Sequence, residues 1–272
     1  GNPLLFRPKD NHKRLNFSAR RLCMPEIPES IFMDGLKELI RLDQDWIPTK
    51  TGSSLYIRPF MFATDEYVGI KPSDRYKFII FTCPVGSYYP EPVGLWVTNE
   101  YVRAIEGGTG AAKAAGNYAA SLLGAQEAKA NGYHNVLWLD GKEGKYIEEC
   151  GTMNVCFVID GKAVTPELTG TILDGITRRS TIQIMQDLGI PVEQRRISLD
   201  EIIDAYDNGQ LQEVFGMGTA ATIAHVAKIG MKGKAMELPP ISERKVANAV
   251  LDRLRAIRTG KAEDTHNWVL RP

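Results

Sequence analysis

The chain has 272 residues, of which 43% are hydrophobic and 24% are charged, a composition typical of a globular protein that buries a large core. Lysine plus arginine equals aspartate plus glutamate at 33 each, so no basic field favours binding to a nucleic acid. No apolar run is long enough to cross a bilayer, and the first residues lack the layout of a signal peptide. We therefore expect a soluble protein, with no membrane partner, that binds small molecules or a second copy of itself.

The four cysteines bear on the redox state of the protein and on metal binding. Cys23, Cys83, Cys150 and Cys156 form no CxxC pair and have no metal-ligand spacing. We expect reduced thiols that are mostly buried, no bound metal, and a location in the cytoplasm.

The chain opens with two predicted helices. Residues 11–20 begin a helical pattern in which Arg14 lies early, where its guanidinium could bind a phosphate or could be a solvated surface group. Between residues 28 and 46 the apolar side chains recur at helical spacing, and Ser30 is the expected N-cap.

Two strands follow, at residues 54–59 and 76–82, because both runs are rich in β-branched and aromatic side chains. Alternation along the first strand places Tyr56 and Arg58 on one face. This pair could form part of a pocket for a carboxylate, or it could be a cross-strand surface pair. The loop between the strands, residues 65–73, could reach a neighbouring subunit.

The stretch from Glu106 to Tyr118 sets Lys113 among glycines and alanines, just before a predicted helix. Small residues leave room for a flat ligand, and a lysine shielded from water by that ligand can act as a nucleophile. Lys113 is therefore a candidate Schiff-base lysine. A dinucleotide fingerprint and a P-loop each lack a required residue here, which leaves a flexible loop with a solvated lysine as the alternative.

The remaining chain alternates strands and helices. A helix is predicted from residue 117 to 131, ended by Gly132, and a strand at residues 136–140. Asp160-Gly161 is the strongest short hairpin signal. Further helices are predicted before Gly189, after Ser198 as N-cap, and from residue 243 to 257.

Two positions in this part could serve a site. Glu149 enters a compact, apolar stretch, where a carboxylate is costly to bury unless it meets a cation or a proton donor. The backbone N–H groups of Ile176 and Thr177 follow a glycine turn at a helix N-terminus and could bind phosphate. An ordinary helix capped by Thr177 is the alternative.

Four separated motifs resemble those of the branched-chain aminotransferases, which are class IV, pyridoxal-phosphate enzymes. They are Gly107-Gly-Thr-Gly-Ala-Ala-Lys113 with Gly116-Asn-Tyr118, Glu149-Cys-Gly-Thr-Met-Asn154, Leu173-Asp-Gly-Ile-Thr177-Arg178, and Gly216-Met-Gly-Thr219-Ala220. The resemblance covers about Leu4 to Lys228 with the family's motif order and spacing. It implies an α+β chain of the D-amino-acid aminotransferase-like fold, with a small domain at residues 1–106 and a larger cofactor domain with a barrel-like sheet at residues 107–272.

The resemblance also implies roles toward pyridoxal 5'-phosphate. Lys113 would bond to the cofactor and move the proton at the substrate Cα. Glu149 would face the pyridine nitrogen and keep it protonated, and Tyr118 would hydrogen-bond the phenolic oxygen. The phosphate would be held by Arg14, Ile176, Thr177 and Thr219.

By the same resemblance, the substrate pocket would be lined by Tyr56, Arg58 and Tyr88, with the backbone of Thr219 and Ala220 at the substrate carboxylate. An apolar wall fits leucine, isoleucine and valine, and Arg58 suits the distal carboxylate of glutamate or 2-oxoglutarate. The loop that holds Ile70 would complete the pocket of the neighbouring subunit, which implies a homodimer.

One departure from the family concerns the start of the chain. Family members carry several dozen residues before the Leu4-Leu-Phe-Arg-Pro8 strand, so we expect a truncated or processed chain whose substrate pocket lacks a wall. Three readings stay open: a branched-chain aminotransferase, a D-amino-acid aminotransferase or aminodeoxychorismate lyase of the same fold, and an inactive chain that only binds the cofactor.

Overall fold

The computed structural model describes residues 3–86, 91–220 and 222–272. Their contacts divide the chain into two units, one made of Gly1–Tyr88 with Ala256–Pro272 and the other of Tyr89–Arg255. The sequence places a domain boundary after residue 106, whereas β4 (Val93–Val97) pairs with two strands of the larger unit. The segment between the two positions therefore makes its contacts within the larger unit.

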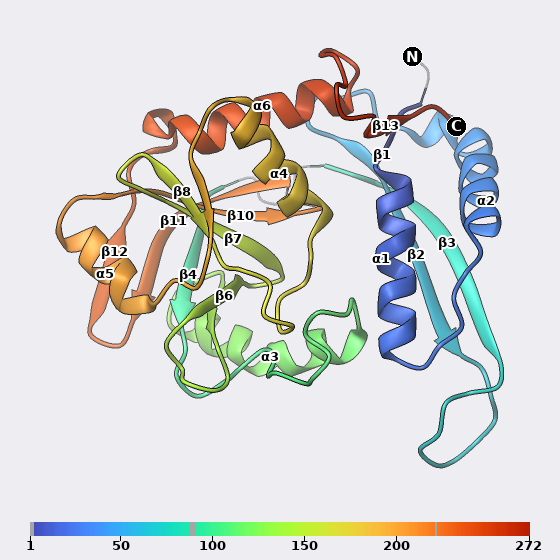
Figure 1. Cartoon of the computed structure of the whole chain (residues 1–272), viewed down its shortest axis with the longest axis horizontal. Helices are drawn as coiled ribbons and strands as arrows, with labels where there is room; N and C mark the ends of the chain where they lie inside the picture. The colour runs from blue at the N-terminus through green and yellow to red at the C-terminus, as the bar shows by residue number, and fades with distance from the viewer. Residues whose placement is uncertain (1–2, 87–90, 221) are drawn as a thin grey trace. The chain divides into compact units, whose positions relative to one another are not determined.

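The smaller unit combines two helices with a long β-hairpin (Figure 1). Its elements are β1 (Leu5–Phe6), α1 (Pro8–Arg21), α2 (Glu29–Leu42), a 3-10 turn (Gln44–Trp46), β2 (Ser54–Ala63), β3 (Tyr76–Val85) and β13 (Val269–Leu270). The predicted helix is confirmed, and Phe32, Leu36 and Ile40 of α2 are buried against apolar residues of the hairpin, whereas Ile31 and Leu42 of the apolar spacing are exposed. The expectation that Ser30 caps α2 is wrong. Pro28, with φ fixed at −54°, allows the helix to begin directly after it, so Ser30 is already helical.

The two sequence ends of this unit pair with each other. β1 and β13 are antiparallel, with Leu5 opposite Leu270. Trp268 packs edge-on against Phe6 at 5.8 Å between ring centroids, and the Arg7 guanidinium lies 4.9 Å from the Trp268 ring centroid. Residues separated by almost the whole sequence therefore stabilise one another.

Within the described residues, the larger unit is built on a nine-stranded sheet. Its strands are β4, β5 (Asn135–Leu139), β6 (Ile147–Cys150), β7 (Met153–Ile159), β8 (Lys162–Thr165), β9 (Val192–Gln194), β10 (Leu211–Gly218), β11 (Thr222–Met231) and β12 (Lys234–Glu237). Its helices are α3 (Ala115–Ala130), α4 (Ile176–Asp187), α5 (Leu199–Asp207), a 3-10 turn (Ile241–Glu243) and α6 (Lys245–Arg258), the last of which runs on into the smaller unit.

The sheet closes on itself. The order β10-β11-β4-β5-β6-β7 becomes a ring because β7 also pairs with β10, antiparallel, with Phe215 opposite Cys156. β8 and β9 continue outward from β7. This arrangement confirms the predicted α+β fold with a barrel-like sheet.

Alternation along the strands decides which side chains fill the ring. In β5, Leu137 and Leu139 join the main core, while Val136 and Trp138 pack on the opposite side with Ala128 of α3. Gly124 of α3 lies so close to Trp138 that an added Cβ would come within 2.7 Å of the indole. The absence of a side chain at Gly124 therefore lets α3 lie close to the sheet.

Local signals for turns and caps in this unit are confirmed. Asp160 and Gly161, with φ of 48° and 75°, join β7 to β8 in a two-residue hairpin. Ser198 caps α5 by accepting a hydrogen bond from Glu201 N. Gly132 and Gly189 follow α3 and α4 with positive φ.

The expectation of mostly buried thiols is only half right. Cys150 and Cys156 are fully buried in the ring, but Cys23 and Cys83 are exposed. Cys83 belongs to the long β3 strand, whose second half is largely accessible, and Cys23 follows α1 with a φ of 55°. Among the helices in the described part of the chain, none combines the length and the apolar character that spanning a membrane requires.

A buried carboxylate anchors α6 to the ring. Glu213 of β10 is 4% exposed, and its two carboxylate oxygens accept the Val246 and Ala247 N–H groups, each at 2.8 Å. These N–H groups belong to the first turn of the helix and have no acceptor within it, so a negative charge here is favourable.

We expect Glu213→Gln to lower the free energy of unfolding by about 1–2 kcal/mol, because one charge-assisted acceptor is replaced by an amide N–H₂ that faces a backbone donor. Urea titration of the variant measures this loss. The matched control is Glu237→Gln, at an exposed position on β12. Equal midpoints for the two variants would contradict the assigned anchoring role.

Candidate active site

Lys113 lies in the loop between β4 and α3, two residues before the helix begins. Its Nζ donates a hydrogen bond of 2.6 Å to Tyr118 Oη, and the ammonium lies 5.4 Å from the Tyr118 ring centroid. Tyr118 belongs to the first turn of α3, so the five-residue spacing brings the two side chains together across the start of the helix.

Asn117 fastens the loop that carries Lys113. Its Oδ1 accepts from Thr109 Oγ1 at 2.7 Å, and its Nδ2 donates to the carbonyls of Thr109 and Ala112, both at 2.8 Å. Gly110, in the same loop, packs against the backbone of Thr171 so closely that a Cβ would not fit. The glycine-rich stretch is therefore a fixed loop rather than a flexible one.

Glu149 and Asn154 are brought together by a tight hairpin. β6 and β7 are joined by a turn at Gly151 and Thr152, which makes Glu149 and Asn154 direct cross-strand partners. Gly151 has a φ of 58°, and an added Cβ would collide with the Asn135 side chain. The spacing within the Glu149–Asn154 motif thus follows from the geometry of a two-residue connection.

These two side chains hold the same peptide unit. Glu149 Oε1 accepts from Leu173 N at 2.9 Å, and Asn154 Nδ2 donates to Leu173 O at 2.9 Å. Asn154 Oδ1 also lies against Gly175, where no Cβ could be accommodated. Together the contacts fix the turn that leads into α4.

The cation that buried Glu149 requires is Arg103. Arg103 Nε lies 3.4 Å from Glu149 Oε2, with both side chains about 5% exposed, and Arg103 Nη2 donates to the Thr171 carbonyl. Burial raises the pKa of Glu149, while the charges of Arg103 and Lys113 and the Leu173 N–H act in the opposite direction. The sequence indicated only that a cation or a proton donor was needed, and Arg103 was missed.

Lys113, Tyr118 and Glu149 open onto one cavity of about 30 Å³, which Arg103, Thr152 and Leu173 also line. The structure thus brings together three of the residues that the sequence proposed. An amine, a phenol and a buried carboxylate on one cavity provide a nucleophile, a hydrogen-bonding hydroxyl and a proton acceptor.

Ile176 and Thr177 are the first two residues of α4, and Gly175 is the N-cap residue. The alternative reading, in which Thr177 caps this helix, is therefore wrong. The N–H groups of this first turn have no acceptor within the helix and are suited to an anion. α4 packs against β10, and Thr219 and Ala220 lie exposed in the turn that ends β10.

The other proposed residues belong to the smaller unit, which is described by itself. Arg14 lies on α1 and donates to Asn11 Oδ1 at 3.3 Å. Tyr56 and Arg58 share one face of β2, as expected, and Arg58 Nη2 donates to Tyr56 Oη at 3.1 Å. Tyr88 lies outside the described residues. The membership of these residues in the pocket around Lys113 stays a prediction.

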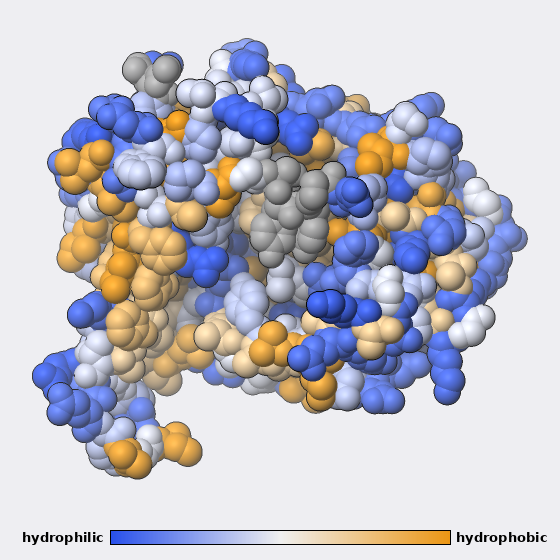
Figure 2. Space-filling view, turned by 180° about the vertical axis from the view of Figure 1, so that it is seen from behind, coloured by the Kyte–Doolittle hydropathy of each residue, from blue (hydrophilic) through white to orange (hydrophobic). Residues whose placement is uncertain are grey.

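Ile70 lies in the loop between β2 and β3. Arg75 and Lys71 form ion pairs with Asp65 and Asp74 at the base of this loop, at 3.2 Å and 2.8 Å. Beyond them Val68 and Ile70 are fully exposed, and Figure 2 shows hydrophobic side chains gathered at the end of the loop. An ordered loop with an apolar end is suited to contact with another surface.

We expect Asn117→Ala to loosen residues 109–113, because three hydrogen bonds of the loop are lost together. Hydrogen–deuterium exchange of the backbone amides measures this, and exchange in the segment should quicken by about tenfold or more. The control is Asn131→Ala at the other end of α3, where Nδ2 donates, among the described residues, to Glu127 O alone. Unchanged exchange in the loop would show that Asn117 does not hold it.

Comparison with known proteins agrees with this geometry. The family model for class IV aminotransferases matches residues 1–229. A probable branched-chain-amino-acid aminotransferase from Staphylococcus epidermidis is 48% identical over 272 residues, covering 98% of this chain and 76% of the relative.

Solved structures give the same result. The branched-chain amino acid aminotransferase of Escherichia coli superposes with a TM-score of 0.81 at 31% identity, covering 98% of this chain and 84% of that one. The T.th. branched-chain amino acid aminotransferase complexed with N-(5'-phosphopyridoxyl)-L-glutamate has a TM-score of 0.81 at 27% identity, with coverages of 99% and 84%. The lysine loop, the Glu149 hairpin and the closed sheet thus occur in a chain that belongs to the class IV aminotransferases, among the branched-chain aminotransferases.

Proposed function

We propose that the protein is a pyridoxal-phosphate-dependent aminotransferase that transfers the amino group of leucine, isoleucine or valine to 2-oxoglutarate, giving branched 2-oxo acids and glutamate. The observation that carries the proposal is the convergence of Lys113, Tyr118 and Glu149 on one cavity, in a chain 48% identical to a probable branched-chain-amino-acid aminotransferase. That name favours this function over a D-amino-acid aminotransferase or an aminodeoxychorismate lyase.

The donor set of the cavity fits pyridoxal phosphate. Lys113 would be the covalent attachment point, Tyr118 the partner of the phenolic oxygen, and Glu149 the partner of the ring nitrogen. The first turn of α4 at Ile176 and Thr177, together with Thr219 and Arg14, would hold the phosphate. One structural relative was solved with a phosphopyridoxyl compound, which supports this choice of cofactor.

Bound pyridoxal phosphate supplies a conjugated ring that accepts the electron pair released at the substrate Cα. The chain supplies the proton movements. Lys113 Nζ would take the proton from the substrate Cα and return it at the cofactor C4′. Tyr118 Oη, which accepts from Lys113 Nζ at 2.6 Å, orients that amine.

Glu149 would hold a proton at the ring nitrogen. Burial favours the protonated carboxyl, and the guanidinium of Arg103 at 3.4 Å favours the carboxylate. The Glu149 carboxyl group is therefore shielded from water and still carries negative charge. Both properties strengthen its attraction to a protonated pyridine ring. Water has little access to this contact, since Glu149 is 4% exposed.

The substrate contacts belong to the same proposal. Tyr56, Arg58 and Tyr88 would line the pocket, the backbone of Thr219 and Ala220 would meet the substrate carboxylate, and Ile70 would enter the pocket of a second copy. We therefore propose a homodimer acting in the cytoplasm in branched-chain amino acid biosynthesis. The apolar end of the loop that carries Ile70 supports the dimer, and light scattering after gel filtration tests it.

We expect Lys113→Ala to abolish transamination of L-leucine with 2-oxoglutarate, because the attachment point and the proton carrier are lost together. The measurements are formation of the branched 2-oxo acid and the absorbance change of added pyridoxal phosphate on adding L-leucine. The control is Lys129→Ala, near the end of α3. Full activity in Lys113→Ala, or a parent protein that converts D-alanine but not L-leucine, would refute the assignment.

We expect Arg58→Ala to raise KM for 2-oxoglutarate by about tenfold or more, through loss of a charge-assisted hydrogen bond to its distal carboxylate. KM for leucine should change much less, because leucine carries no second carboxylate. Arg41→Ala, an exposed position on α2, is the control. Equal changes in both KM values would argue against this role.

A further inference from the structure

Glu148 is a second buried carboxylate beside Glu149, and the proposed mechanism does not use it. The two residues are adjacent in β6, so their side chains point to opposite faces of the strand. Glu148 is 4% exposed. Among the described residues its Oε2 has no hydrogen-bond partner, which is unusual for a buried polar atom.

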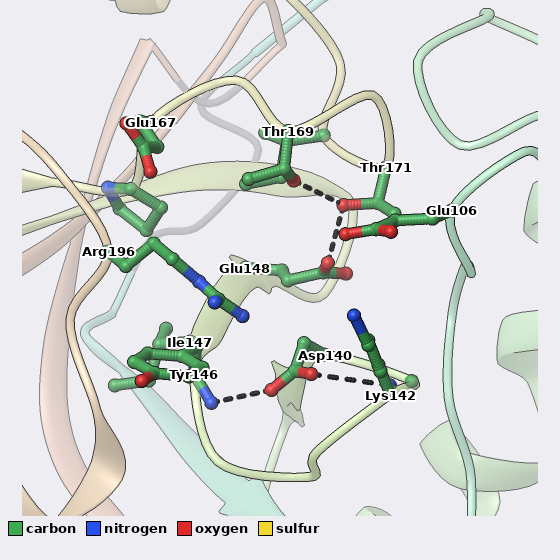
Figure 3. Close-up of a pocket in the computed structure, with 13 residues that line it drawn as sticks. Glu106, Asp140, Lys142, Tyr146, Ile147, Glu148, Glu167, Thr169, Thr171 and Arg196 are labelled. Carbon is green, nitrogen blue, oxygen red and sulfur yellow. Dashed lines mark hydrogen bonds between the residues drawn. The ribbon is translucent and has the colours of Figure 1, made fainter.

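Glu148 lines a second cavity of about 20 Å³, separate from the one that holds Lys113. Figure 3 shows its carboxylate among the residues that line this cavity, with the end of Lys142 directed toward it. The Arg196 guanidinium lies 3.6 Å from the Tyr146 ring centroid and forms an ion pair with Glu143. The charged and titratable groups that line the cavity with it are Glu106, Asp140, Lys142, Tyr146, Glu167 and Arg196. On the side of the first cavity, Arg103 and Glu149 act on the Glu148 carboxylate, and Lys113 and Tyr118 also line that cavity.

Thr171 connects the two cavities. Its hydroxyl donates to Glu148 Oε1 and contacts Thr169 Oγ1 at 2.8 Å (Figure 3). Its carbonyl accepts from Arg103 Nη2, and Arg103 forms the ion pair with Glu149. A continuous series of contacts therefore runs from Glu148 through Thr171 and Arg103 to Glu149.

The charges along this series do not balance. One buried guanidinium, Arg103, interacts with two buried carboxylates. Burial raises the pKa of Glu148 to about 7, with Glu149 and Asp140 adding to the effect and Thr171 and Arg103 opposing it. Glu148 can therefore gain or lose a proton near neutral pH, while Glu149 forms the ion pair with Arg103.

We propose that Glu148 is a positioning residue of the cofactor site, whose charge acts through Thr171 and Arg103 to strengthen the hold of Glu149 on a protonated pyridine nitrogen. This inference rests on the proposed function. When Glu148 is ionised, its negative charge partly neutralises the positive charge of Arg103. Arg103 then repels the proton between Glu149 and the pyridine nitrogen less strongly. When Glu148 is protonated, Arg103 acts on Glu149 alone.

The direction of the effect follows. Ionised Glu148 is populated above about pH 7, where a pyridine ring more readily loses its proton. The negative charge of Glu148 then favours retention of the proton on the pyridine nitrogen, so the site keeps its affinity for a protonated ring as the pH rises. In a variant without this charge, the affinity for the protonated ring should fall as the pH rises.

The test compares wild type with Glu148→Gln, which keeps the acceptor for Thr171 and removes the charge. The probe is 4'-deoxypyridoxine 5'-phosphate, which has the ring nitrogen and the phosphate but no aldehyde, so reaction with Lys113 does not contribute. We expect the ratio of the Kd of Glu148→Gln to that of wild type to be near one at about pH 6 and to rise by about threefold to tenfold at about pH 8. Titration of the ligand phosphate cancels in this ratio.

Two further variants test whether the charge of Glu148 changes the Kd through Thr171 and Arg103. Glu213→Gln also neutralises a buried carboxylate, but at the anchor of α6, and its Kd ratio should not change with pH. In a Thr171→Val background, which keeps the carbonyl for Arg103, Glu148→Gln should have a much smaller effect than in wild type. An undiminished effect in that background would overturn the role of Thr171.

Thermal unfolding without ligand provides a readout that does not involve the cofactor. Because the pKa of Glu148 is raised on folding, its stabilising contribution is present at low pH and is lost as the pH rises through about 7. Glu148→Gln should therefore gain in Tm relative to wild type between about pH 5 and pH 8.

The possible results are distinguishable. If the probe binds wild type but the Kd ratio does not depend on pH, this inference is wrong and the proposed function stands. If the probe does not bind wild type, the proposed function and this inference both fail. A Tm difference that is constant with pH would also contradict the titration of Glu148 on which the inference depends.

Discussion

The buried carboxylate of Glu149, beside the loop that carries Lys113, requires a positive charge close to it. The arrangement of the segments around the candidate active site depends on this requirement. Glu149 is 4% exposed, and leaving it unpaired at such a position would cost several kcal/mol. Arg103 supplies the charge at 3.4 Å. To do so it must itself be buried, and its remaining donors must be used, which explains its bond to the Thr171 carbonyl. The ion pair therefore connects the segment around residue 103 to β6, and the bond to Thr171 connects it to the segment before α4.

The hairpin of β6 and β7 also fixes the position at which α4 begins. Because Glu149 and Asn154 face each other across the strands, one side chain takes the N–H and the other the carbonyl of Leu173. The start of α4 is then fixed relative to the carboxylate. A ligand that spans from Glu149 to the first turn of α4 would meet both groups already oriented, which lowers the entropy lost on binding.

The sequence predicted the parts of this arrangement that depend on local geometry. The helix that places Tyr118 beside Lys113, the Asp160-Gly161 hairpin and the Ser198 cap are all short-range features. Lys113, Tyr118 and Glu149 were proposed together through the family resemblance, and they do line one cavity. Arg103 could not be predicted, because the residues around it have no periodicity and its partners lie far along the chain.

Other differences have the same cause. The contact of Glu148 with Thr171 depends on how the β6 strand and the segment before α4 fold together, which no local pattern records. The exposure of Cys83 depends on which face of the long β3 strand is covered. Ser30 is not the cap because the helix begins at Glu29, directly after Pro28, although serine and proline are both common at helix starts.

The pairing of β1 with β13 has a consequence for synthesis. The larger unit, Tyr89–Arg255, is continuous in sequence and is inserted between the two parts of the smaller unit. During translation the ring can close before residues 269–270 have been made, whereas Leu5 and Phe6 have to wait for them. The smaller unit is thus discontinuous in sequence, and β1 has no β13 partner until the whole of the larger unit has been synthesised, which exposes this strand to mispairing in the meantime.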